Sequence, residues 1–204
     1  NADKKKGEEE LYIPYWALSL NELINIFPGN LSDSQIEYFR SKVYEEKLES
    51  LNLLNWKNIN DKAVSADSPI PFSINKLWFE LDDFERRTLL RDRVTLTNLV
   101  EKGDFNQWKS NIYTVAAIGG GEPFLNNASK GILSYLANLR SKCLDKRYSF
   151  LFHPDKWNPV FEGEWGDKSG NWKKYKKMSI KKDIDELIFN WIGGEKPITI
   201  LDLS

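Results

Sequence analysis

The chain has 204 residues, 41% of them hydrophobic and 29% charged, with a formal net charge of −1. This composition is typical of a soluble globular protein with one sizeable core, and the near-zero charge excludes a global preference for nucleic acid, membrane or acidic ligands. Cys143 is the only cysteine and His153 the only histidine, which excludes an internal disulfide and a cysteine/histidine zinc site.

No apolar stretch approaches the roughly 20 residues that a bilayer-spanning helix needs, so we expect a cytoplasmic protein without membrane contact. Residues 1–10 begin with Asn-Ala instead of Met and continue as a charged run. We interpret them as the remnant of a cleaved expression tag followed by a disordered start. A deliberately cut piece of a longer protein would explain both ends.

Capping motifs predict two consecutive helices near the start. Ser19 has Glu22 three residues later, which predicts a short helix that stops at the Pro-Gly pair of residues 28–29. Ser32 has Gln35 at the same spacing, which predicts a second helix to about residue 54.

The next segments alternate between loop and helix. Two prolines and several small polar residues predict a loop over residues 61–72. A helix from near Ser73 is expected to carry Leu77, Leu81 and Phe84 toward the core. Residues 88–118 alternate weakly and fit a helix, short strands or both.

The second half predicts a strand, a helix and another strand. Ser129 is expected to cap a helix to about residue 144, residues 148–152 to form a short strand, and residues 155–179 to form an exposed excursion. Ser179 and Gly193 bound a further amphipathic helix, and residues 198–203 read as a buried strand. Phe150 and Ile200 would then lie on parallel strands joined by a right-handed crossover. The expected fold is helix-rich α/β with a small parallel sheet.

Three segments resemble, in order, parts of HerA/FtsK-type P-loop ATPases, especially HerA-like proteins of bacteria. They are LYIPYWALSLNELINIF (11–27), DKRYSFLF (145–152) and WIGGEKPITILDLS (191–204), and the likeness extends over residues 11–55 and 130–204. It implies that the chain leaves a RecA-like core at the first segment, for a helical insertion, and that the last segment is a core strand preceding the Walker B strand. Residues 11–130 would be the helical insertion, and residues 131–204 part of the RecA-like core.

The chain departs from that family where nucleotide chemistry occurs. A Walker A loop has the pattern G-x-x-x-x-G-K-[ST], which is absent here. The nearest stretch, GGGEPFLNNASKG (119–131), has Glu122 and Pro123 where free amides are needed, so we interpret it as a turn. Asp202 is followed by Leu203 and Ser204 instead of a second acid, and a strand-end hydrogen bond is its expected role. We therefore expect no catalytic, nucleotide-binding or metal-binding residue in the chain, and ATP and magnesium only in its parent.

Acidic pairs beside aromatic residues offer a second kind of chemistry. Asp82-Asp83, or Glu162 and Glu164 near Trp165, could serve acid/base hydrolysis of a sugar. Adjacent acids on a helix usually face solvent, however, and His153 has no nearby nucleophile at a recognisable elbow. Four tryptophans lie in apolar stretches and are expected in the core: Trp16, Trp56, Trp78 and Trp191.

One segment concentrates positive charge around aromatic residues, a mixture suited to phosphate contacts and base stacking. Lysines near a helix start oppose the helix dipole, which favours a purpose other than stability. A solvated loop is the alternative interpretation. The candidate nucleic-acid-binding residues are Trp172, Lys173, Lys174, Tyr175, Lys176, Lys177, Lys181 and Lys182.

We therefore expect a non-catalytic internal fragment of a HerA/FtsK-like ATPase. The resemblance implies a parent that uses ATP hydrolysis to move along or process DNA, as a homo-oligomeric ring. The fragment's partners would be the remainder of that ATPase and DNA. Two alternatives stay open: a self-contained nucleic-acid-binding or protein-interaction module, and a carbohydrate-active protein that binds saccharide through Trp157, Trp165 and Trp172.

Overall fold

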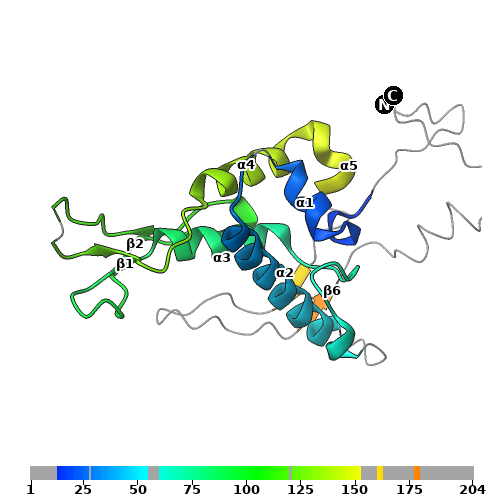
Figure 1. Ribbon diagram of the computed structural model, residues 1–204, viewed down its shortest axis with the longest axis horizontal. Helices are drawn as coiled ribbons and strands as arrows, with labels where there is room; N and C mark the ends of the chain where they lie inside the picture. Colours follow the sequence, from blue (N-terminus) through cyan, green and yellow to red (C-terminus); the bar gives the residue numbers. More distant parts are fainter. Residues whose placement is uncertain are drawn as a thin grey trace, which may run out of the picture.

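The computed structural model shows a helical body from which a β-sheet arm extends (Figure 1). It describes residues 13–27, 29–54, 60–119, 121–152, 160–162 and 177–179. The expected helix after Ser179 and the strand over residues 198–203 lie outside these ranges, as do Trp56 and Trp191.

The two N-terminal helices confirm the capping motifs. After a 3₁₀ turn, η2 (Tyr15–Ala17), the capping box of Ser19 and Glu22 opens α1 (Leu20–Ile26), with the Ser19 N–H donating to Glu22 Oε2 at 2.8 Å. Helix α2 (Asp33–Leu54) follows, and the Ser32 N–H donates to Gln35 Oε1 at 2.9 Å.

The loop predicted over residues 61–72 and the helix predicted after it are both confirmed. Residues 61–72 form a loop that contains the 3₁₀ turn η3 (Asp61–Ala63). The Ser73 hydroxyl then accepts from the Lys76 N–H and caps α3 (Ile74–Arg86). Leu77 and Leu81 of α3 are buried as expected, and Phe84 is half-buried.

Helix α4 spans Leu133–Leu144 and is followed by η5 (Lys146–Tyr148) and α5 (Ser149–Phe152). Two predictions were wrong here. Ser129 does not cap α4, because the helix starts after Ile132. Residues 148–152 are helical and not a strand, because the Asp145 side chain accepts from the Arg147 N–H and starts the turn that leads into α5. A short apolar run fits either structure, so the cap decides.

All strands in the described ranges pair antiparallel. The pairs are β1 (Thr88–Leu89) with β4 (Phe124–Leu125), β2 (Leu99–Glu101) with β3 (Ile112–Tyr113), and β5 (Val160–Glu162) with β6 (Lys177–Ser179). The 3₁₀ turn η4 (Phe105–Gln107) lies between β2 and β3. The predicted parallel pair is not supported, because Phe150 is helical and Ile200 lies outside the described ranges.

One hydrophobic core joins the helices. It includes Trp16 and Trp78, as predicted, and it crosses the boundary that the sequence placed between residues 130 and 131. Its buried members come from both sides of that boundary and include Tyr15, Leu23, Phe39, Phe72, Leu77, Phe105, Ile132, Leu136, Leu139 and Phe152. Helices α1 to α5 therefore share one core, so α4 and α5 belong to the helical body.

Candidate functional site

Nearly all residues predicted to bind nucleic acid lie outside the residues that the structure describes. Lys177 alone is described, as the first residue of β6, which lies beside α2 (Figure 1). The rest of the set, residues 172–176 and Lys181 and Lys182, lies outside the described ranges, as do Trp157, Trp165, Glu164 and His153. The nucleic-acid and saccharide hypotheses therefore remain predictions, and the described polar sites lie elsewhere.

The first such site joins the two ends of the helical body. The Ile13 N–H donates to the Phe150 carbonyl at 2.9 Å, so the segment before α1 lies directly against α5. Next to this bond the ring of Tyr15 stacks on Phe152 with a centroid distance of 5.6 Å, and Phe152 also contacts Phe27 at 5.7 Å. We call this group, Ile13, Tyr15, Phe27, Phe150 and Phe152, the junction.

Tyr15 ties the junction to the start of α3. Its hydroxyl donates to the Phe72 carbonyl and accepts from the Ile74 N–H at 3.1 Å, while its ring meets the Phe72 ring edge-on at 5.4 Å. The residue is 1% exposed, and this burial raises the pKa of the phenol well above its ordinary value. Tyr15 is therefore a neutral structural bridge between three segments.

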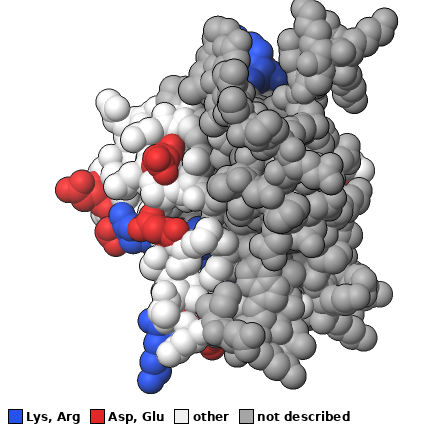
Figure 2. Space-filling model, turned by 90° about the vertical axis from the view of Figure 1, so that its right-hand side faces the viewer, with Lys and Arg blue, Asp and Glu red and all other residues white. Residues whose placement is uncertain are grey.

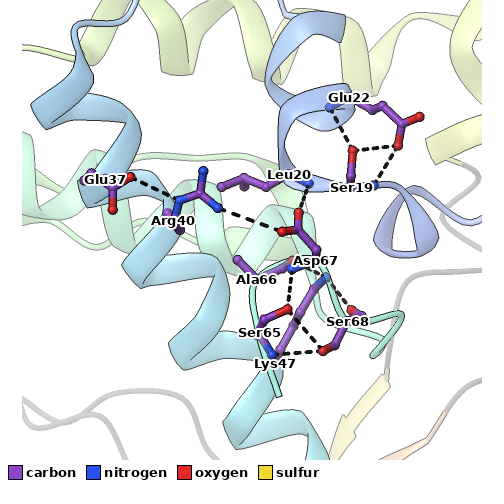
Figure 3. A network of polar contacts seen from close by, with 10 residues as sticks. All are labelled: Ser19, Leu20, Glu22, Glu37, Arg40, Lys47, Ser65, Ala66, Asp67 and Ser68. Atoms are coloured by element: carbon purple, nitrogen blue, oxygen red, sulfur yellow. Dashed lines mark hydrogen bonds and ion pairs between the residues drawn. The ribbon is translucent and has the colours of Figure 1, made fainter. Parts of the chain in front are cut away.

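A buried lysine holds the loop before α3 against α2 (Figure 3). Lys47 Nζ donates to the carbonyls of Ala66 and Ser68, each at 2.6 Å, and lies 3.5 Å from the carbonyl of Trp16. Burial lowers the pKa of Lys47 to about 8, and the nearby carboxylate of Asp67 opposes that shift. The ammonium replaces water as the partner of carbonyls that the loop would otherwise bury unpaired.

Asp67 in the same loop reaches two helices (Figure 3). Its Oδ1 accepts from the Leu20 N–H at 2.7 Å, in the first turn of α1, where a negative charge is favourable. Its Oδ2 lies 3.9 Å from Arg40 Nη1 on α2, and Arg40 also pairs with Glu37 at 3.2 Å. Lys47 and Asp67 together fasten the loop between α1 and α2.

A second buried lysine lies on α3. Lys76 Nζ contacts Glu46, and it lies 2.9 Å from both Glu49 and Glu80. Burial alone would lower the pKa of Lys76, but the three carboxylates raise it above its ordinary value, so the ammonium stays charged. This cluster joins α2 and α3, and its carboxylates are paired with a cation rather than free to bind one.

The acidic pair Asp82-Asp83 was predicted to face solvent, and this is wrong. Both side chains are buried, because each is neutralised by an arginine one turn later: Asp82 pairs with Arg86 and Asp83 with Arg87, both at 2.7 Å. Asp83 Oδ1 also accepts from Asn111 Nδ2 at 2.6 Å and from the Tyr113 hydroxyl at 2.7 Å. Both carboxylates are therefore buried and paired within the chain.

The amides at the start of α4 are occupied by a carboxylate of the chain itself. Glu85 Oε1 accepts from the Lys130 N–H at 2.6 Å, and Oε2 accepts from the N–H groups of Gly131 at 2.8 Å and Ile132 at 3.3 Å. These N–H groups lie at the end of residues 119–131, the stretch nearest to a phosphate-loop pattern, and at the start of α4. The Glu85 carboxylate occupies the N–H groups that a bound anion would need. It also caps the start of α4, the role expected of Ser129.

Further chemistry is limited within the described ranges. Burial raises the pKa of the Cys143 thiol, so it is not a thiolate at neutral pH. No cluster of three His, Cys, Asp or Glu side chains with metal-site geometry occurs among the described residues.

Acidic and basic side chains lie close together on the described part of one face (Figure 2). None of the described helices combines the length and apolar character that a membrane crossing requires.

Comparison with models of known protein families and with curated protein sequences found no match.

Proposed function

We propose that residues 13–152 are a helical insertion domain of a HerA/FtsK-like ATPase, and that this chain is an internal segment of that protein. One observation carries the proposal: the Ile13 N–H is bonded to the Phe150 carbonyl at 2.9 Å. A domain inserted into another fold must begin and end at neighbouring points, so that the host chain is not forced apart. The junction meets this requirement.

The resemblance assigns roles to the two segments that meet there. Residues 11–27 are similar to the place where the family's chain leaves the RecA-like core, and residues 145–152 belong to the second similar region. Departure and return at one point support an insertion. We place the end of the insertion near residue 152, not at residue 130, and the support is that α4 and α5 share the core of the other helices.

The parent would hydrolyse ATP with magnesium and move or process DNA in the cytoplasm, as a ring of identical subunits. The chain itself would not hydrolyse ATP, since it contains no Walker A pattern. Phosphate release from ATP and magnesium by the purified 204-residue chain tests this part. A rate equal to that of a protein-free control is expected, and turnover above that control would overturn the proposal.

We also propose that the basic segment contacts DNA in the parent. The support is its composition of lysines around Trp172 and Tyr175, since its side chains lie outside the described ranges. Retention on DNA at low salt, lost at high salt and lost when Lys173, Lys174, Lys176 and Lys177 become glutamate, is the expected result. Equal retention of the wild-type and glutamate chains would contradict the assignment.

A further inference from the structure

The β-sheet arm, residues 88–126, carries most of the exposed apolar side chains of the described chain. Of the exposed large hydrophobic residues, only Leu133, Leu144 and Phe150 lie elsewhere. The arm contributes Leu90, Val94, Leu99, Val100, Ile112, Val115, Ile118 and Leu125, with exposed fractions from 37% to 104%. Exposed apolar surface that is gathered on one element marks an interaction site.

The arm is attached firmly to the helical body. At its base, the buried carboxylate of Asp83 binds Arg87, Asn111 and Tyr113. Thr88 Oγ1 donates to the Thr114 carbonyl at 2.8 Å and thereby joins the two halves of the arm. Farther out, the Arg93 guanidinium lies 3.7 Å from the centroid of the Phe124 ring. A fixed base lets the arm present its apolar residues in one arrangement, which lowers the entropic cost of binding.

The arm lies at the opposite end of the described body from α1 and α5. Figure 1 shows β1 and β2 at one end, beyond α3, and α1 and α5 at the other. The junction of Ile13 and Phe150 is therefore at the end opposite the arm. A second polypeptide can therefore approach the arm without meeting the junction.

The charge of the arm argues for a protein partner. Nucleic acid and anionic lipid surfaces require an excess of positive charge. The arm has none, and two copies of it would not repel each other through net charge. Its basic residues, Arg91, Arg93, Lys102 and Lys109, are equal in number to its acidic residues, Asp92, Glu101, Asp104 and Glu122.

The exposed apolar area fits an interface between two arms. Burying one such side chain removes roughly 60–120 Å² of apolar surface from water, so the eight, which are on average about two-thirds exposed, offer on the order of 300–600 Å². A standard protein interface buries about 800 Å² on each partner, of which about 450–500 Å² is apolar. One arm therefore supplies about the apolar surface that one partner of a stable dimer contributes.

We propose that the arm binds the arm of a second copy of this chain, forming a two-fold dimer through its apolar residues. A symmetric contact places the same surface on both partners, and a ribbon with zero net charge tolerates this. Because apolar residues lie on both faces, as at Leu99 and Val100, the two ribbons would coil around each other to bury all eight side chains. The proposal is independent of the ATPase assignment and concerns the 204-residue chain as it is.

Sedimentation velocity of the full chain between about 1 and 100 µM tests this dimer. The wild type is expected to pass from monomer to dimer, and the double variant Val100→Asp/Ile118→Asp to stay monomeric, a loss of affinity of at least about tenfold. The control is Leu144→Asp, at an exposed leucine of α4 outside the arm, which should dimerise like the wild type. Circular dichroism and the melting temperature establish that each variant is folded.

A wild type that remains monomeric at 100 µM would overturn the proposal and leave the arm to a different protein. A dimer that persists in the double variant would also overturn it, because the contact would then lie elsewhere. Binding of the wild type to vesicles of neutral phospholipid, lost in the double variant, would assign the arm to a membrane surface and contradict the dimer.

Discussion

The Ile13 N–H donates to the Phe150 carbonyl at 2.9 Å and so joins the segment before α1 to α5. Close to it in the sequence, the buried rings of Tyr15 and Phe27 both contact the ring of Phe152. The segment before α1 and helix α5 are therefore held together by a backbone bond as well as through the core.

Tyr15→Phe is expected to lower the free energy of unfolding by about 1–3 kcal/mol. The variant keeps the stacked ring but removes the hydroxyl, which leaves the buried Phe72 carbonyl and Ile74 N–H without that partner. Urea denaturation followed by tryptophan fluorescence measures the change. Tyr44→Phe, at a half-buried tyrosine of α2, is the matched control, and an equal loss in both variants would contradict the bridging role.

Lys47 should make stability depend on pH in the alkaline range. Its pKa is about 8 in the folded chain and near 10.5 when unfolded, so between these values the unfolded chain binds more protons. The free energy of unfolding contributed by Lys47 therefore rises with pH from about 8 to about 10.5, by roughly 1–3 kcal/mol.

The comparison of wild type with Lys47→Met isolates this effect, because the variant keeps the apolar stem and removes the titrating group. At pH 7 the variant leaves the carbonyls of Ala66 and Ser68 without their partner. The difference in stability between the two proteins should change by the stated amount between pH 7 and pH 10.5 in urea denaturation. A difference that stays constant over this range would show that the pKa of Lys47 is not lowered.

Asp83→Asn is expected to loosen the arm more than the helices. The amide cannot neutralise Arg87 or accept as strongly from Asn111 and Tyr113, so a loss of about 2–4 kcal/mol is expected. Hydrogen exchange should increase first over residues 88–126. Asp92→Asn, at the exposed tip of the arm, is the control and should change exchange only near its own turn. Uniform acceleration across α1 to α4 in Asp83→Asn would refute a role specific to the arm.

Glu85→Gln should weaken the start of α4. The amide group keeps one acceptor but loses the charge that three N–H groups share, which costs about 1–3 kcal/mol. Exchange of the amides of residues 130–132 should rise at least tenfold, whereas Glu22→Gln, at the exposed cap of α1, should have a smaller effect on stability. Unchanged exchange at residues 130–132 would contradict the capping role of Glu85.

Local signals predicted the first three helices well. The capping residues Ser19, Ser32 and Ser73 lie immediately before α1, α2 and α3, because each side chain binds an amide within its own first turn. Ser129 failed as a cap because the partner of the α4 amides, Glu85, lies far away in the sequence. Long-range partners of this kind leave no local pattern.

The polar sites were missed for the same reason. No sequence spacing indicates that Lys47 binds the carbonyl of Ala66 in the loop before α3. Asp83 was expected to be exposed because its partner Tyr113 on β3 lies 30 residues away in the sequence. The Asp83 and Arg87 spacing of four residues was the one available signal, since it predicts an ion pair on a helix. The strand expected at residues 148–152 depended on a partner strand that the described chain does not supply. Helix α5 instead packs Leu151 and Phe152 into the core.

The coding sequence on either side of this segment tests the central claim most directly. An insertion within a HerA/FtsK-like ATPase predicts a G-x-x-x-x-G-K-[ST] loop upstream of residue 11 and an apolar strand ending in paired acidic residues downstream of residue 204. A reading frame that starts and stops at the ends of this chain, with neither element, would contradict it.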